Sequence, residues 1–384
     1  MDCNDKAQTD TFEQSSEGGR RTFLKAAGAS GVAGLAGLTG CLGGGAGGST
    51  PTIKMLAWTS YSEEQELIEE ALDVELDVTK SSSSAKMFSA WNSGQAENYD
   101  ICVPNNNYVS KFIDADLAAP VPRDDMQYYP EMYGKFQTFA KNQFGADGNV
   151  YGVPIRFGWY GYSYDSRDIS VDKEDSYAVL FDEGYTDSEM KGKVMMYDNH
   201  FKSISAAALY LGYRDAFDGD RITLSDKQLD EAKQLLIDQK PMVEGYTSAD
   251  ATFIKSYKQD NASAALTGRY LPTEMKLDGD GWATMAQPKE GEMAWFEGAV
   301  VSKASDNKEM AWKVVDQYLS PEVGAQFSKK AGIPSTNPAA ADNLSGQAAE
   351  LLTIEPSRLE GMLPFKLMED EDKWVSAWEQ VKAA

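Results

Sequence analysis

The residue types that most often carry out catalysis are scarce in this chain of 384 residues. Its single histidine, His200, would have to serve any Ser/His/Asp or Cys/His mechanism, because such mechanisms need a histidine base. An exposed histidine at a predicted helix start is more common than a ligand contact. The spacings typical of zinc and calcium sites, HExxH, CxxC and the EF-hand loop, do not occur. The sequence therefore predicts a protein that is not an enzyme and needs no cofactor or metal.

Signal cleavage and lipid attachment are predicted near the N-terminus. Residues 20–24, RRTFL, match a twin-arginine export signal, and an uncharged apolar run then leads to a lipobox, LTGC, at residues 38–41. The apolar run is too short to span a bilayer comfortably. We therefore expect residues 1–40 to be a removable signal and Cys41 to carry lipid. The Gly/Ser-rich residues 41–51 would then be a flexible tether.

Removal of that signal leaves Cys102 as the one unmodified thiol, so no disulfide can form within the mature chain. Cys102 belongs to a β-like run, residues 99–104, and this favours a buried, inert thiol. With the lipobox, these features lead us to expect an exported monomer that is anchored by lipid at Cys41 to the outer face of the cytoplasmic membrane.

The charge of the chain is strongly negative, with a formal net charge of −24 at pH 7. A charge of this sign disfavours binding to nucleic acid. Acid-rich runs such as residues 369–372 are typical of a solvated surface, and a surface covered by carboxylates suits high salt. We infer a halophilic source.

The order of predicted elements places two polar turns where ligands often bind. Apolar, β-rich runs alternate with helical patterns, which indicates an α/β fold with mostly parallel sheets. Residues 52–58 are predicted as a strand, and a capping-box pattern begins a helix at Ser62. Residues 58–61 therefore lie at a strand-to-helix turn, the end of an open α/β sheet where ligands bind. Residues 198–199 form a second such turn.

Two long β-like runs, residues 151–164 and 294–301, could each cross between two lobes. The part of the chain after the lipobox is longer than a typical single domain, which also favours two lobes. A cleft between lobes is a favoured ligand site. The predicted boundaries are residues 52–160 plus 299–338 for lobe 1, and residues 161–298 plus 339–384 for lobe 2.

Eight short motifs occur in an order and spacing that match a known family. They are Trp58-Thr59-Ser60-Tyr61, residues 99–104 (YDICVP), Tyr108-Val109-Ser110-Lys111, Tyr151-Gly152-Val153-Pro154, Met196-Tyr197-Asp198-Asn199, Pro288-Lys289-Glu290-Gly291, Trp295-Phe296-Glu297 and Gly332-Ile333-Pro334-Ser335. Over roughly residues 53–338 the chain resembles the spermidine/putrescine-binding proteins of polyamine ABC transporters, a type of extracellular solute-binding protein. The resemblance implies a two-lobed periplasmic-binding-protein-like fold, hinge closure around a small-molecule solute, and docking on membrane permease subunits.

In this family, aromatic faces flank the methylene chain of the ligand and carboxylates meet its amines. Trp58, Tyr61, Trp295 and Glu297 fall on the matching positions. Side chains two apart in a strand share a face, so Trp295 and Glu297 can meet one end of a ligand. The predicted ligand-binding residues are Trp58, Thr59, Tyr61, Asn105, Asn107, Tyr108, Trp159, Asn199, Lys202, Arg269, Trp295 and Glu297.

The departures from the family pattern concern charge. Where polyamine binders present two acids at the strand-to-helix turn, this chain has Asn199 and Lys202, and Asn107 and Leu266 replace aromatic residues. A buried ammonium facing Lys202 would cost several kcal/mol, which disfavours an extended di- or tricationic polyamine.

Basic residues near the expected cleft suggest an anionic group on the ligand instead. Arg156 and Arg269 are expected there with Lys202, and helix N-termini could also hold an anion. Because Trp295 and Glu297 still suit an amine, a zwitterion would satisfy both sets of residues.

Four other functions remain open from the sequence. Ferric-ion capture by tyrosinates could use Tyr128 with Tyr129, or Tyr160 with Tyr162, although nineteen tyrosines make such pairs common by chance. An anionic, phosphonate-type solute would suit the same fold. A cell-surface enzyme or a purely structural lipoprotein is the remaining alternative.

Overall fold

A mixed sheet connects the two halves of the fold. The computed structural model describes residues 50–170, 172 and 175–384, and within them ten strands form one sheet. The main path is β2-β1-β3-β11-β6-β9-β7-β8, while β10 pairs with β6 and β12 with β11. Cys41 and the predicted signal lie outside the described residues.

The first half surrounds the parallel strands β1 to β3. Its elements are β1 (Thr52–Ala57), α1 (Thr59–Glu63), α2 (Glu66–Leu72), β2 (Glu75–Lys80), α3 (Ser84–Ala90), β3 (Ile101–Cys102), α4 (Asn106–Asp114), α5 (Gly134–Gln143), β4 (Gly145–Ala146), β5 (Asn149–Val150), α11 (Lys308–Tyr318) and α12 (Pro321–Ala331).

The second half surrounds the parallel strands β7 to β9. Its elements are α6 (Ala178–Phe181), β7 (Val194–Tyr197), α7 (His200–Tyr210), α8 (Asp226–Asp238), β8 (Val243–Thr247), α9 (Asp250–Lys258), β9 (Ala264–Gly268), α10 (Tyr270–Leu277), β10 (Ala283–Met285), α13 (Gly346–Leu352), β12 (Met362–Pro364) and α14 (Glu371–Ala383).

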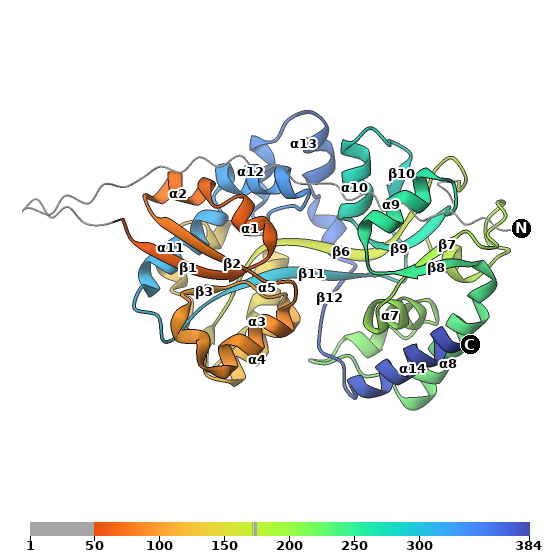
Figure 1. Ribbon diagram of the computed structural model, residues 1–384, viewed down its shortest axis with the longest axis horizontal. Coiled ribbons are helices and arrows are strands. Elements are labelled where there is room, and N and C mark those ends of the chain that lie inside the picture. The colour runs from red at the N-terminus through yellow and green to blue at the C-terminus, as the bar shows by residue number, and fades with distance from the viewer. Residues whose placement is uncertain (1–49, 171, 173–174) are drawn as a thin grey trace, which may run out of the picture. The chain divides into compact units, whose positions relative to one another are not determined.

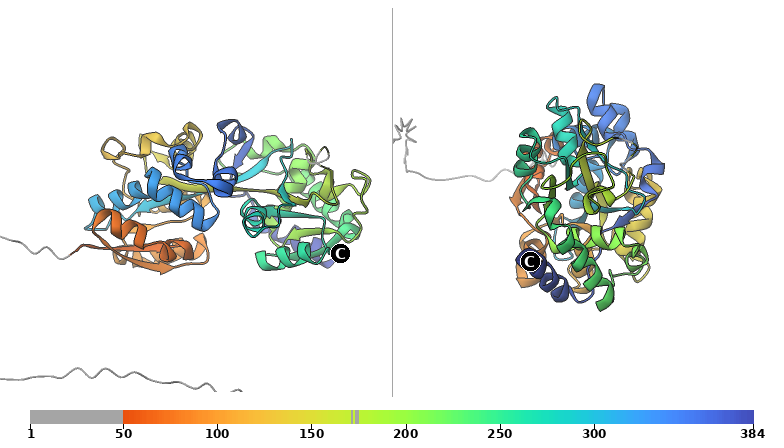
Figure 2. Two further views of the ribbon diagram at one scale, coloured as in Figure 1. Left: turned by 90° about the horizontal axis from the view of Figure 1, so that it is seen from above. Right: turned by 90° about the vertical axis from the view of Figure 1, so that its right-hand side faces the viewer.

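Two long antiparallel strands, β6 (Val153–Asp165) and β11 (Glu292–Val301), run from one half to the other. Figure 1 shows them side by side in the middle of the fold, and in Figure 2 the orange N-terminal strands and the green strands again lie at their opposite ends. Every residue of both strands is buried. These strands correspond to the two crossing runs expected from the sequence, and the exact lobe boundaries stay predictions.

Each half has its own hydrophobic core, and the long strands contribute to both. Phe157 and Phe296 belong to the first core, whereas Tyr162 and Trp295 belong to the second. Because successive side chains on a strand point to opposite faces, one strand can serve two different sets of neighbours.

Local sequence signals explain several helix ends. In α12 the Ser320 hydroxyl accepts a hydrogen bond from the amide of Val323, Pro321 occupies the first turn, and Gly332 ends the helix with a φ of 66°. The predicted strand at residues 52–58 is confirmed as β1. The capping box predicted at Ser62 is wrong, because α1 already begins at Thr59 and the Ser62 hydroxyl donates to the carbonyl of Thr59.

The aromatic packing around Phe296 gives a test of the first core. The Phe296 ring is fully buried, and its centroid lies 5.5–5.6 Å from those of Phe136, Phe139 and Phe144. We expect Phe296→Ala to lower the free energy of unfolding by about 3–5 kcal/mol, because it removes a buried ring and leaves a cavity. Urea unfolding measures this effect, and Val375→Ala, at a side chain that is 40% exposed, is the matched control. A loss below about 1 kcal/mol for Phe296→Ala would contradict this packing.

Candidate functional site

The predicted ligand-binding residues fall into three groups in the structure. The first surrounds Glu297 and the turns that follow β1 and β3. The second surrounds Lys202 at the start of α7. Trp159 and Arg269 form a third group on another face of β6.

Glu297 is engaged by two protein side chains. Its Oε2 accepts hydrogen bonds from Arg156 Nε at 2.6 Å and from the Tyr61 hydroxyl at 2.7 Å, and its Oε1 accepts one from Arg156 Nη2 at 2.9 Å. Glu297 is 4% exposed and Arg156 is 3% exposed. An ammonium group could therefore reach this carboxylate only by displacing Arg156.

Aromatic rings enclose the guanidinium of Arg156. Its Cζ lies 5.0 Å from the Tyr61 ring centroid and 4.5 Å from that of Phe327. Burial, the largest single effect, lowers the pKa of Arg156, but the charge and hydrogen bonds of Glu297, together with the nearby tyrosines, raise it above its ordinary value. Burial, followed by the charge of Glu297, raises the pKa of Tyr61 well above its ordinary value. Arg156 is therefore held in its charged form beside Glu297.

Trp295 and Glu297 have neighbours on β6 that are also two residues apart. A Cβ at Gly158 would lie 2.7 Å from the Trp295 indole, so the ring packs directly on the glycine backbone. Glu297 pairs with Arg156, and Arg156 and Gly158 share a face of β6. This agrees with the expectation that Trp295 and Glu297 point the same way. The sequence signal for such a close contact is a glycine inside a strand pattern.

The turns after β1 and β3 lie at the same edge of the sheet, because these strands are parallel neighbours. Trp58 precedes α1 and is half-buried, and Thr59 is exposed. Asn105 precedes α4, and its backbone amide donates a hydrogen bond to the Ser84 hydroxyl at 2.9 Å. The remaining predicted residues of this edge, in the first turn of α4, are the half-buried Asn107 and Tyr108.

Lys202 lies between two tyrosine rings. Its Nζ is 3.6 Å from the ring centroid of Tyr197 and 3.8 Å from that of Tyr160. Burial lowers the pKa of Lys202 to about 7, and the charge of Asp250 opposes this shift. Within the described ranges, Lys202 forms no salt bridge with a carboxylate.

Asn199 has a structural role beside Lys202. It precedes α7, and its side-chain oxygen accepts a hydrogen bond from the Lys202 amide at 3.1 Å. His200 follows it, and its Nε2 lies 3.3 Å from a carboxylate oxygen of Glu371. The part of the chain that the structure describes contains no group of three or more His, Cys, Asp or Glu side chains placed to hold a metal ion.

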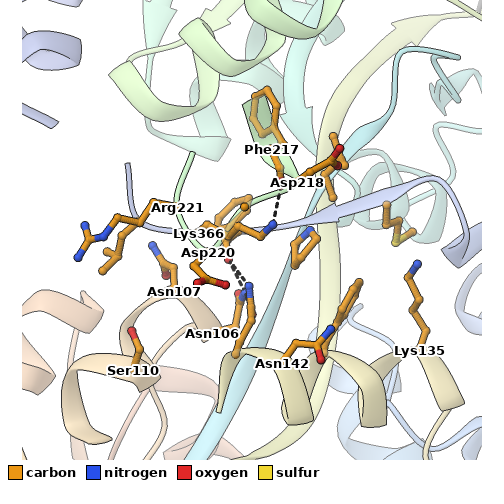
Figure 3. A pocket seen from close by; sticks show the side chains of 18 of the residues that line it. Asn106, Asn107, Ser110, Lys135, Asn142, Phe217, Asp218, Asp220, Arg221 and Lys366 are labelled. Carbon is orange, nitrogen blue, oxygen red and sulfur yellow. Dashed lines mark hydrogen bonds between the residues drawn. The ribbon is translucent and has the colours of Figure 1, made fainter. Parts of the chain in front are cut away.

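A pocket of about 770 Å³ opens between the two halves, and sequence reasoning missed most of it. Figure 3 shows Asn106 and Asn107 of α4 on one side and Lys366 on the other. The Lys366 ammonium donates to the carbonyl of Phe217 at 2.5 Å, and burial lowers the pKa of Lys366. The segment around Lys366 carries neither a motif nor a clear element pattern, so no sequence signal indicated it.

Phe365 links this pocket to Lys202. Its carbonyl accepts a hydrogen bond from Asn106 Nδ2 at 2.8 Å, and its ring stacks 6.0 Å from that of Tyr160. Tyr160 in turn lies against the Lys202 ammonium. Packed side chains therefore connect the pocket at the start of α4, through Phe365 and Tyr160, to Lys202 at the start of α7.

Trp159 and Arg269 are separated from this region. Trp159 and Tyr160 are successive residues of β6, so their side chains point to opposite faces of the strand. Trp159 and Arg269 line a second pocket beside α10 and α13.

The buried Arg156–Glu297 pair should be costly to break. Arg156→Met leaves the Glu297 carboxylate buried without its counter-charge, and we expect the free energy of unfolding at pH 7 to fall by about 3–5 kcal/mol. Replacing both residues by methionine should restore much of that loss. Chemical unfolding checks this, with Lys313→Met, which breaks an exposed pair with Glu309, as the control. Equal effects of Arg156→Met and Lys313→Met would refute a tight buried pair.

Known proteins with similar sequences are named for binding putrescine, agmatine or spermidine. A putrescine/agmatine-binding protein of Pseudomonas aeruginosa is 24% identical over 255 residues, which cover 63% of this chain and 66% of that protein. The spermidine/putrescine-binding periplasmic protein of Escherichia coli K12 is 23% identical over 269 residues, which cover 67% and 69%. The chain thus spans about two thirds of the length of these relatives.

Solved structures show the same fold. The spermidine/putrescine ABC transporter substrate-binding protein PotD of Streptococcus pneumoniae superposes with a TM-score of 0.71 at 18% identity, covering 87% of this chain and 99% of that one. The Atu4243–GABA receptor superposes with a TM-score of 0.66 at 15% identity, covering 86% and 97%. Both neighbours confirm the predicted two-lobed, periplasmic-binding-protein-like α/β fold. The model of the bacterial extracellular solute-binding protein family matches residues 65–354, so this chain belongs to that family.

Proposed function

We propose that this chain captures a small solute outside the cell and delivers it to the permease subunits of an ABC importer. Support comes from its family, from relatives named for solute binding, and from a neighbour described as an ABC transporter substrate-binding protein. The candidate site lies at strand-to-helix turns of both halves, where closure around a hinge would enclose a ligand. The function requires no catalytic step.

The environment of Lys202 carries our proposal for the solute class. Its ammonium faces Tyr160 and Tyr197, whose rings attract a cation but do not neutralise it. A second ammonium brought to the same place would meet like charge in a desolvated setting. A solute carboxylate or another anionic group would instead supply the counter-charge that the protein does not place in contact.

The Arg156–Glu297 pair supports the same conclusion. Glu297 occupies a position that the family resemblance assigns to amine binding, yet a guanidinium of this chain already holds both of its oxygens. A solute with two separated cations would therefore meet a protein cation at both positions. We propose a solute with one anionic group and at most one amine, and a zwitterion fits this description. The fold neighbour described as a GABA receptor is consistent with it, since GABA carries one carboxylate and one ammonium.

A diamine is the second candidate, because the relatives are named for putrescine and spermidine. The lowered pKa of Lys202, about 7, would allow that side chain to become neutral in mildly alkaline solution. Diamine binding would then strengthen as the pH rises, which is the opposite of the trend for an anion.

Binding measurements on Lys202 variants distinguish the two candidates. For wild type, titration calorimetry should show tighter binding of GABA than of putrescine or spermidine at pH 6.5, and Lys202→Glu should reverse that order by at least about tenfold. His200→Gln, a neighbour on the same helix, is the control. Tight spermidine binding by wild type that Lys202→Glu leaves unchanged would refute the proposed solute class.

The proposed solute should bind in a pH-dependent manner. Because the pKa of Lys202 is lowered to about 7, its charge is present below pH 7 and is lost as the pH rises above it. Burial raises the pKa values of Tyr160 and Tyr197, so both rings stay neutral over this range. Affinity for an anionic solute should fall by up to about tenfold per pH unit above pH 7. In a Lys202→Met variant the affinity should no longer change with pH. If the pH dependence persists in the variant, another titrating group causes it.

We also propose that lipid at Cys41 holds the protein at the outer face of the cytoplasmic membrane. The lipobox at residues 38–41 supports this anchor. No helix among the described residues is long and apolar enough to cross a membrane.

Replacement of the lipobox cysteine tests the anchor. Cys41→Ala should move the protein from the membrane fraction to the soluble fraction in cells, because one lipid attachment is removed. Cys102→Ala, at a buried thiol, is the matched control and should stay with the membrane. If Cys41→Ala remained fully membrane-bound after a high-salt wash, another anchor would have to exist.

A further inference from the structure

A second pocket, of about 520 Å³, lies on the face of β6 opposite to Lys202. Trp159 of β6 lines it together with residues of α10, of α13 and of the segment 353–358. Figure 1 shows α10 and α13 next to each other beside β6, and Gln347 Nε2 of α13 donates to the carbonyl of Lys276 in α10 at 2.8 Å. This pocket shares no lining residue with the one in Figure 3.

Two guanidinium groups meet on the Trp159 indole. The Cζ of Arg269 lies 5.0 Å from the ring centroid, and that of Arg358 lies 4.8 Å from it. Arg269 is 7% exposed, and the side chain of Arg358 is 20% exposed. Two like charges are therefore held beside one ring, where little water can separate them.

The charges of these two arginines are incompletely balanced. Glu292, which is 2% exposed, forms a salt bridge with Arg358 but none with Arg269. The two carboxylates of the pocket wall, Glu350 and Glu355, are exposed residues. The buried base of the pocket thus holds two positive groups and one negative group.

Arg269 also has an unused donor. Its Nη2 donates to the carbonyl of Leu351, whereas its Nη1 is buried and has no hydrogen-bond partner among the described residues. Burial, followed by the charge of Arg358, lowers the pKa of Arg269 to about 10. A buried donor without a partner and an excess positive charge both favour a negatively charged acceptor at this place.

We propose that this pocket is a second binding site, for a small oxyanion such as a carboxylate or a phosphate. The oxyanion would accept hydrogen bonds from Arg269 Nη1 and from the Arg358 guanidinium, which suit planar, two-point recognition of oxygen atoms. Thr273 and Ser357 also line this pocket, and the Thr273 hydroxyl donates to the carbonyl of Arg269. The indole of Trp159 would contact any apolar part of the ligand. Trp159 and Arg269, which the sequence suggested for the transported solute, would then serve this separate site.

Titration calorimetry of the purified full chain with inorganic phosphate, at constant ionic strength, tests the proposal. Wild type should bind phosphate at one site, and Arg358→Gln should weaken that binding by at least about tenfold. Arg269→Lys should weaken it similarly, because it keeps the charge but loses the planar fork. Thermal unfolding should show phosphate stabilising wild type more than either variant.

Two control variants separate the site from a general charge effect. Arg123→Gln makes the same change of charge as Arg358→Gln at an exposed residue outside this pocket, and phosphate affinity should not change. Lys202→Met, on the opposite face of β6, tests whether phosphate binds at the proposed solute site instead, and binding in the second pocket should persist in this variant. If Arg269→Lys folds poorly because α13 is released, Arg358→Gln still gives the answer.

Three outcomes would overturn the proposal. Wild type could fail to bind phosphate. The Arg358→Gln and Arg269→Lys variants could bind phosphate as well as wild type does. Lys202→Met could abolish the binding, which would place the anion at the solute site instead.

Discussion

The pairing of β6 with β11 is the constraint on which both halves of the fold depend. Each strand is buried along its whole length and contributes side chains to two separate cores. Arg156 of β6 and Glu297 of β11 join the strands through a buried ion pair, and Tyr61 of α1 bonds to the same carboxylate. Because a buried charge needs its partner, this network fixes how the first turn after β1 lies against the connecting strands.

The same arrangement underlies the proposed limit on the charge of the solute. In a polyamine site, protein carboxylates meet ligand amines, and the ligand brings the cations. Here the chain brings its own cations: Arg156 holds Glu297, and Lys202 occupies the space between Tyr160 and Tyr197. Aromatic rings accept a protein ammonium as readily as a ligand ammonium, so the aromatic residues alone do not indicate which of the two binds. The answer depends on which cation already contacts those rings, and here that cation is the ammonium of Lys202.

The sequence predicted secondary-structure elements and residue types better than it predicted which side chains contact one another. Motif order correctly indicated the fold, and the β-like runs at residues 151–164 and 294–301 correspond to β6 and β11. The pairing of Glu297 with Arg156 joins residues far apart in the chain, and only the register of the two strands reveals it. Side chains alternate along β6, so Trp159 points away from Tyr160 and from the Lys202 that contacts it. The sequence alone does not show which elements cover each face of that strand. The segment around Phe365 carries no motif, although it links the two halves of the candidate site.

The net charge of −24 does not by itself compensate the cations inside the protein. Exposed charges separated by more than about 8–10 Å are largely screened at physiological or higher salt. Lys202 and Arg269 therefore depend on the groups in direct contact with them, which are tyrosine rings for the first and a carbonyl and an indole for the second. An approaching anion is repelled by the surface at long range and attracted only at these contacts. Salt weakens the repulsion more than it weakens a desolvated contact, so an acid-rich surface and cationic groups in the interior are compatible with the proposed anionic solute.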